Sequence, residues 1–96
     1  MQLYARQGDL VFDKRPLSGE FKQEAGVVLA GRDSAPHTVV GTVGVRREGL
    51  TTLLRVKRKT LVTHAGRHKT IALEPGDYEV RPLRERGSGE DRAVED

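Results

Sequence analysis

Glycine and proline interrupt this chain so often that long helices or long strands are not expected. The 96 residues include eleven glycines and four prolines, which separate short runs rich in valine, leucine and threonine. Branched side chains favour extended backbone, and turn residues at short spacing favour many short strands. The pattern predicts an all-β protein with one small domain: an antiparallel β-sandwich, a roll or a small barrel of seven or eight short strands.

The size and composition of the chain limit its organisation. Ninety-six residues with a hydrophobic fraction of 35% allow one domain with a thin core. We expect that domain to span residues 1–86, and we expect the small, charged segment 87–96 to be a disordered acidic tail. The chain has no cysteine, which excludes disulfides and thiolate metal sites. Neither a secretory leader nor an apolar run of membrane-spanning length is apparent, so we expect a cytoplasmic protein without a membrane partner.

Several local patterns predict individual elements. Gly8 and Asp9 favour a turn, and the polar segment 14–26 is expected to be a loop. The segment TVVGTVGV predicts one strand with three valines and Gly41 on one face, namely Val39, Val43 and Val45. The segment 50–60 predicts a strand with an apolar face, formed by Leu50, Thr52, Leu54 and Val56. The sequence Glu74-Pro75-Gly76-Asp77 predicts a type II turn, because Pro and Gly occupy its second and third positions.

Three segments resemble a family of small bacterial and phage proteins. That family opens with an Arg-Gln-Gly-Asp motif, carries a central Gly-His-x-His segment, and ends with a histidine pair, a Pro-Gly-x-Tyr turn and Arg-Glu. The matching residues here are Arg6, Gln7, Gly8, Asp9, His37, His68, Pro75, Gly76, Tyr78, Arg84 and Glu85. The resemblance covers nearly all of the chain before the tail, and it implies an all-β fold but no particular activity.

This chain departs from the family pattern at the central motif. Ala35 stands in place of the first central histidine, and Ser34 stands in place of the preceding glycine. The spacing between His64 and His68 is also one residue longer. If the family's histidines bind a metal, this chain has lost part of that site.

Histidines are the candidates for a metal site. Imidazole nitrogen is a common ligand for zinc and other transition metals. His37, His64 and His68 would form such a site if their strands pair, in a cupin-like arrangement, with Asp33 or Glu74 supplying an oxygen. The alternative, which we favour from the sequence, is that His64 and His68 only flank a turn and are solvated.

Basic residues are the candidates for a binding surface. Between positions 46 and 69 only Glu48 opposes eight cations, which are Arg46, Arg47, Arg55, Lys57, Arg58, Lys59, Arg67 and Lys69. Such a cluster is typical of a surface that binds nucleic acid or an acidic protein. The alternative is an edge strand whose charges prevent aggregation.

Catalysis has little support in the sequence. No Gly-x-Ser-x-Gly elbow or phosphate loop occurs. Asp9 is expected to cap its own turn rather than to act as a ligand or a base. We therefore expect a non-enzymatic binding module that needs no cofactor and that engages nucleic acid or an acidic protein partner through a basic β-hairpin from Arg46 to Lys69. The alternatives are a histidine metal site, with zinc as the example, and a structural, homo-oligomeric component of a phage or mobile-element assembly.

Overall fold

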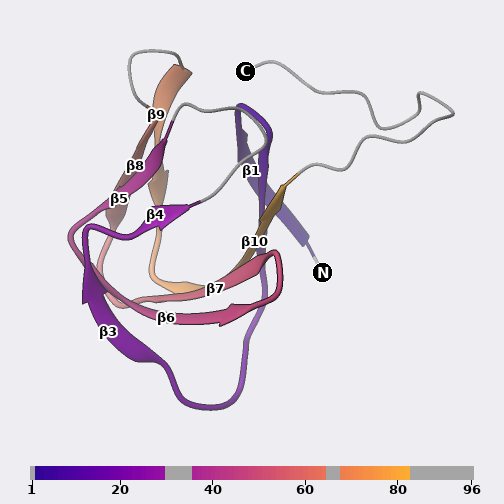
Figure 1. Cartoon of the computed structure of the whole chain (residues 1–96), viewed down its shortest axis with the longest axis vertical. Helices are drawn as coiled ribbons and strands as arrows, with labels where there is room; N and C mark the ends of the chain where they lie inside the picture. The colour runs from indigo at the N-terminus through magenta and orange to yellow at the C-terminus, as the bar shows by residue number, and fades with distance from the viewer. Residues whose placement is uncertain (1, 30–35, 65–67, 83–96) are drawn as a thin grey trace, which may run out of the picture.

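The structure is a computed structural model that describes residues 2–29, 36–64 and 68–82. Ten strands form two antiparallel sheets in this part of the chain (Figure 1). The first sheet has six strands in the order β1 (Gln2–Gln7), β2 (Leu10–Lys14), β10 (Gly76–Pro82), β7 (Thr51–Val56), β6 (Thr42–Glu48) and β3 (Lys22–Ala25). The second has four strands in the order β4 (Val28–Leu29), β5 (His37–Val40), β8 (Thr60–His64) and β9 (His68–Leu73).

The all-β prediction is therefore confirmed, with more strands than the expected seven or eight. Within the described residues the two sheets remain separate, so the architecture is a sandwich-like pair of sheets and not a closed barrel. This part of the chain also contains no helix of the length and apolarity that a membrane crossing requires. The expected tail at 87–96 lies outside the described residues.

The chain passes between the two sheets at four points, after β3, β5, β7 and β9. The crossing after β5 consists of Gly41 alone, whose φ of 113° is a conformation that side chains other than glycine rarely adopt. The prediction of one strand over TVVGTVGV was wrong for this reason: Gly41 ends β5 in one sheet and β6 begins in the other. Val39, Val43 and Val45 are nevertheless all buried in the core.

The core lies between the facing surfaces of the two sheets. Its largest apolar side chains include Phe12 and Tyr78 from the six-stranded sheet and Leu29 and Leu73 from the four-stranded sheet. Alternation along β7 sends Leu54 and Val56 into this core, as predicted. Leu50 does not follow the pattern, because it lies in the β6–β7 turn after Gly49 and is 82% exposed.

The segment 15–21 covers the outer face of the six-stranded sheet. The backbone N–H of Leu17 donates to the Asp77 carboxylate at 2.8 Å, and the Arg55 guanidinium donates to the other Asp77 oxygen at 3.0 Å. The Phe21 ring lies under two guanidinium groups, those of Arg46 and Arg55, at 4.8 and 4.2 Å. The expectation of a loop over 14–26 was thus right for 15–21, but Lys22–Ala25 forms edge strand β3 against β6.

Two tyrosines hold the bend between β9 and β10. The Tyr4 hydroxyl donates to the carbonyl of Ala72 at 2.9 Å and accepts from the N–H of Glu74 at 3.3 Å. The Tyr78 hydroxyl donates to the Glu74 carbonyl, and the two rings meet edge to face at 5.1 Å. The predicted type II turn was wrong in detail: Gly76 already belongs to β10 with φ 148°, where a type II turn needs about 80°.

Asp77 links the covering segment to the sheet, and its charge state therefore affects stability. Burial raises the pKa of Asp77, but the hydrogen bonds from Arg55 and Leu17, together with the Arg55 charge, outweigh burial and hold the pKa below 3.8. A carboxyl whose pKa is lowered by folding stabilises the protein above its unfolded pKa. That contribution is lost as the pH falls through the folded pKa.

We expect Asp77→Asn to lower the free energy of unfolding by about 2 kcal/mol at neutral pH, because charged hydrogen bonds are lost. The difference from wild type should shrink as the pH falls below about 4. Urea unfolding, monitored by circular dichroism from neutral pH to below about pH 4, measures this difference in the free energy of unfolding. The control is Glu48→Gln at an ion pair whose acidic side chain is 59% exposed, where we expect a change below about 1 kcal/mol. An Asp77→Asn difference that does not depend on pH would contradict the assignment.

Candidate functional site

Three segments that are distant in sequence meet at one end of the sandwich. They are the β1–β2 connection with Gln7, Gly8 and Asp9, the start of β5 with His37, and the end of β8 with His64. The side chains of all four polar residues are buried. His37 is paired with His64 in the β5–β8 ladder, and His64 is paired with His68 in the β8–β9 ladder. We call Gln7, Gly8, Asp9, His37 and His64 the polar cluster.

The two described histidines of the polar cluster stack on one another. Their ring centroids are 3.7 Å apart and the ring planes differ by 20°. The sequence favoured a solvated, turn-flanking His64, but its side chain is 2% exposed and His37 is fully buried. The expectation of solvated histidines was therefore wrong for His64. Ladder pairing is the reason, because directly opposed residues on one face of a sheet bring their side chains together.

Gln7 fixes which nitrogen of His37 carries a proton. The Gln7 amide nitrogen donates to the carbonyl of Val62 at 2.8 Å, and a carbonyl oxygen only accepts. The Gln7 amide oxygen therefore faces His37 Nδ1, at 2.9 Å. Since that oxygen also only accepts, Nδ1 of His37 is the donor, and in neutral His37 the lone pair lies on Nε2.

Asp9 faces that second nitrogen. Its Oδ1 lies 3.6 Å from His37 Nε2, and its side chain is 9% exposed. The turn-capping role expected from the sequence does not describe this contact. Turn chemistry is local, whereas His37 is brought to Asp9 only by the packing of β5 against the β1–β2 connection.

Gly8 allows the histidine rings to approach the backbone. A Cβ atom built at Gly8 would lie 2.6 Å from Cε1 of His64 and 3.3 Å from Cε1 of His37. The φ of Gly8, 58°, is also in the left-handed region. The three motif residues after Arg6 thus have distinct roles in the polar cluster. Gln7 supplies a hydrogen-bonding amide, Gly8 lets the histidine rings approach the backbone, and Asp9 supplies a carboxylate.

The structure assembles only part of the expected metal-binding set. His68 belongs to β9 opposite His64, but its side chain and all of Asp33 lie outside the described residues. Glu74 is at the far end of the β8–β9 pair, next to the position where Thr60 pairs with Leu73. Among the described residues, no three His, Asp or Glu side chains are arranged to hold a metal ion.

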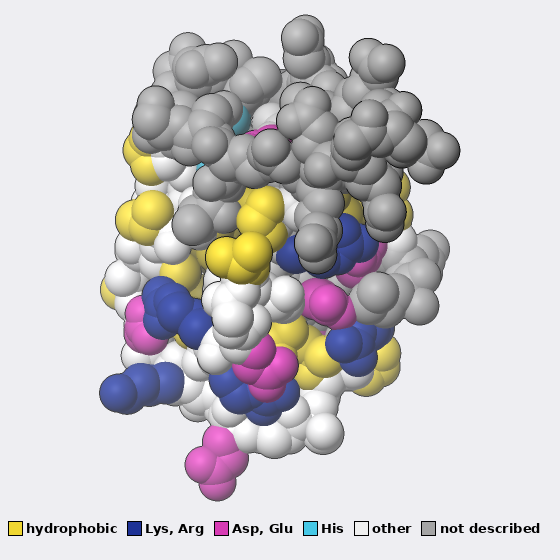
Figure 2. Space-filling model, turned by 45° about the vertical axis from the view of Figure 1, so that its right-hand side comes forward, with side chains coloured by type: hydrophobic (Ala, Val, Ile, Leu, Met, Phe, Trp, Pro, Cys, Tyr) yellow, Lys and Arg dark blue, Asp and Glu magenta, His cyan; other side chains and the backbone are white. Residues whose placement is uncertain are grey.

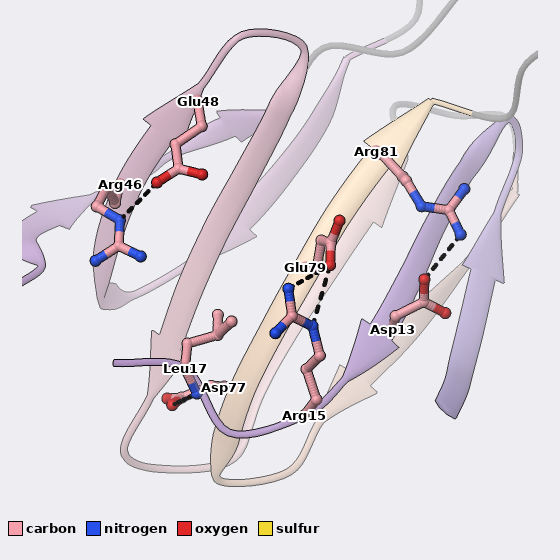
Figure 3. Close-up of polar contacts among 8 residues, drawn as sticks. All are labelled: Asp13, Arg15, Leu17, Arg46, Glu48, Asp77, Glu79 and Arg81. Atoms are coloured by element: carbon pink, nitrogen blue, oxygen red, sulfur yellow. Dashed lines mark hydrogen bonds and ion pairs between the residues drawn. The ribbon is translucent and has the colours of Figure 1, made fainter. Parts of the chain in front are cut away.

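Three of the expected basic residues are held in ion pairs. Arg46 contacts Glu48 at 3.2 Å, Arg47 contacts Glu24 at 3.1 Å, and Arg55 contacts Asp77 at 3.0 Å. Figure 3 shows Arg46 and Glu48 on the outer face of the six-stranded sheet, and on the same face, beyond β7, the further pairs Arg15–Glu79 and Arg81–Asp13. On the face drawn in Figure 2, basic and acidic side chains lie next to one another.

The segment 46–69 is also not one hairpin. It comprises parts of both sheets and passes between them after β7. The edge-strand alternative fails for Arg55, because β7 lies between β10 and β6. Arg67 and the side chain of Lys69 lie outside the described residues.

Lys57, Arg58 and Lys59 form the crossing from β7 to β8 and are exposed. None of the ion pairs among the described residues involves them. Together with the crossing at Gly41 they surround a hollow of about 450 Å³. The other described residues that line it are Gln23, Val40, Thr42 and Thr60, so none of the described lining residues is acidic. We call this the basic hollow.

Replacing Gly8 tests whether the His64 ring packs so closely against the backbone that position 8 has no room for a side chain. We expect Gly8→Ala to lower the free energy of unfolding by about 1 kcal/mol for the left-handed backbone and by a further 1–3 kcal/mol or so for the overlap with His64. Gly49→Ala is the matched control, with φ 62° and open space around its Cβ position. Urea unfolding of both variants measures the difference, and equal losses would show that the rings do not press on Gly8.

Comparison with models of protein families, with curated proteins and with solved structures finds no match to this chain. The resemblance to the small bacterial and phage family therefore stays a sequence-based expectation. The polar cluster and the basic hollow are the two candidate functional sites of the described residues.

Proposed function

We propose that this protein is a binding module that holds the phosphate groups of nucleic acid in the basic hollow. The observation that carries the proposal is the meeting of three consecutive exposed cations, Lys57, Arg58 and Lys59, around one concave surface. Phosphate oxygens are best bound where several cations converge without acidic neighbours. The described lining of the basic hollow meets that condition.

The distribution of ion pairs supports this location. Arg46, Arg47 and Arg55 each contact a carboxylate, so their charge is already compensated within the fold. The side-chain hydrogen bond from Arg47 lowers the pKa of Glu24, which keeps that acid ionised and the pair intact. The positive charge of the segment 46–69 is thus concentrated, within its described part, at the crossing after β7.

The chemistry of the lining supports phosphate contacts over base contacts. Gln23 and Thr42 add an amide and a hydroxyl that donate hydrogen bonds to phosphate oxygens, and Gly41 exposes backbone. No aromatic side chain is among the described lining residues, so stacking with bases is not provided there. We therefore expect binding that depends strongly on salt and weakly on nucleotide sequence.

Reversing two charges at the basic hollow tests the proposal. We expect wild type to bind a labelled duplex oligonucleotide with an affinity that falls as salt rises. Lys57→Glu with Lys59→Glu should weaken binding to every sequence and reduce the slope of log affinity against log salt by about 2. Fluorescence anisotropy over a salt series measures both.

The matched control is Arg6→Glu with Lys22→Glu, which makes the same change in net charge at two exposed residues outside the basic hollow. It should retain most of the affinity and the slope. Equal losses in both double variants would mean that binding follows net charge, which would contradict a defined site. Stronger competition by polyglutamate than by unlabelled oligonucleotide would instead assign an acidic protein as the partner.

A second candidate, self-assembly as a structural component, has one observation in its favour. The outer face of the four-stranded sheet carries three exposed apolar side chains, Val28, Val40 and Leu61. Val40 and Leu61 are directly paired between β5 and β8, so they form one surface. Exposed apolar groups of this kind are typical of contact surfaces.

For this candidate we expect sedimentation velocity to show oligomers whose fraction rises with protein concentration. Leu61→Lys should shift the protein toward monomer, because it places a charge on the apolar face. Thr70→Lys, at another exposed position of the same sheet, is the control. A strict monomer at every concentration would exclude self-assembly.

A further inference from the structure

The outward side chains of β4, β5 and β8 form a surface without charged groups. Ladder pairing places Val28 beside Thr38, Thr38 beside Thr63, and Val40 beside Leu61. The apolar residues that alternate with them point into the core. The exposed fraction is 57% for Val28, 52% for Val40 and 45% for Leu61. We call Val28, Thr38, Val40, Leu61 and Thr63 the neutral face.

The neutral face is unusual in a chain so rich in charge. Charged residues make up 32% of the sequence. On the outer face of the six-stranded sheet, Arg15, Arg55 and Arg81 each contact a carboxylate. A partner that docked on that face would have to displace or desolvate these ion pairs. A partner that covers the neutral face gains apolar contact without disturbing any of them.

The partner that fits the neutral face is a second copy of this chain. The chain has a net charge of +3, so two copies repel each other where their cations meet. Between two neutral faces only valine, leucine and threonine side chains meet, and no charge is brought next to a like charge. Nucleic acid and acidic proteins find no cation there to contact. We propose that two copies pack their neutral faces against each other in a two-fold dimer, with the facing sheets about 10 Å apart.

Two-fold pairing also closes the assembly. Such a contact uses the same surface on both subunits, so neither copy keeps a neutral face for a third. The proposal rests on the self-assembly candidate, to which it gives a size and a contact surface, and it does not depend on nucleic-acid binding. Val40 belongs to the neutral face and also lines the basic hollow. The dimer therefore carries two basic hollows at the rim of its interface.

Salt separates dimer formation from nucleic-acid binding. Lys57, Arg58 and Lys59 of each copy line the hollow that borders the neutral face, and their repulsion opposes association at low salt. Added salt screens this repulsion, whereas it does not weaken contact between apolar side chains. The dimer should therefore become tighter as salt rises, while binding of nucleic acid in the basic hollow becomes weaker.

The first experiment is sedimentation equilibrium of the untagged full chain over a range of protein concentrations, at low and at high sodium chloride. We expect a monomer–dimer equilibrium without larger species, and a dissociation constant that falls severalfold as salt rises. A strict monomer would overturn both this dimer and the self-assembly candidate. Oligomers larger than the dimer, or a dimer that dissociates as salt rises, would overturn the pairing of neutral faces and leave self-assembly standing.

Nitrogen-15 NMR of the wild-type protein locates the contact surface. Amide signals that shift as the protein concentration rises should belong to β4, β5 and β8. Shifts centred on β7 and β10 would place the contact on the six-stranded sheet and overturn the proposal, although self-assembly itself would remain.

The second experiment replaces exposed apolar side chains by amides and leaves the net charge unchanged. Val40→Gln with Leu61→Gln should weaken the dimer at least tenfold, because both side chains lose apolar contact across the interface. The matched control is Leu3→Gln with Leu50→Gln, at side chains that are 53% and 82% exposed outside the neutral face. The control should dimerise as wild type does, and circular dichroism checks that both double variants are folded. Undiminished dimerisation of the folded Val40→Gln, Leu61→Gln variant, or equal weakening in the control, would overturn the proposal.

Discussion

The crossings between the two sheets determine how everything else in this protein is arranged. Each crossing sends the next strand to the opposite sheet, so residues adjacent in sequence face different environments and residues distant in sequence become neighbours. Both candidate sites follow from this. The basic hollow lies between two crossings, those at Gly41 and at 57–59. The polar cluster lies where the β1–β2 connection of one sheet meets β5 and β8 of the other, and Gln7 joins them by its bond to Val62.

A thin core makes polar contacts more important than usual for a domain of this size. The apolar side chains between the sheets are mostly valine and leucine, with few aromatic rings. Asp77 holds both Arg55 and the covering segment 15–21 on the outer face of the six-stranded sheet. The hydroxyl groups of Tyr4 and Tyr78 hold the bend before β10. Burial raises the pKa of Tyr78 above its usual 10, so its hydroxyl stays a donor at any ordinary pH. Buried polar groups of this kind stabilise one arrangement of the strands over others, provided that each is hydrogen-bonded.

The fold class followed from the sequence, whereas the strand boundaries did not. Alternation and turn residues identified strands at Val39, Val43, Val45, Leu54 and Val56, because burial of one face is a local pattern. The strand Lys22–Ala25 was missed because its residues are polar and partly exposed, and only pairing with β6 makes them extended. The charges of Arg47 and Arg55 were counted as a binding surface because Glu24 and Asp77, the carboxylates that compensate them, lie more than twenty positions away in the sequence. The pair of Arg46 with Glu48 is local, two positions apart on β6.

The sequence by itself determined that this chain forms short strands, where most of them lie, and that Arg6–Asp9 and the histidines are unusual features. Short-range physics controls those properties: backbone preference, turn geometry and the spacing of apolar residues. Only the tertiary structure decided that Asp9 faces His37, that His37 stacks on His64, and that Lys57, Arg58 and Lys59 remain outside the ion pairs among the described residues. Asp9 and His37 are 28 positions apart and His37 and His64 are 27 positions apart. The other placement depends on which sheet a strand enters, and no local pattern encodes that choice.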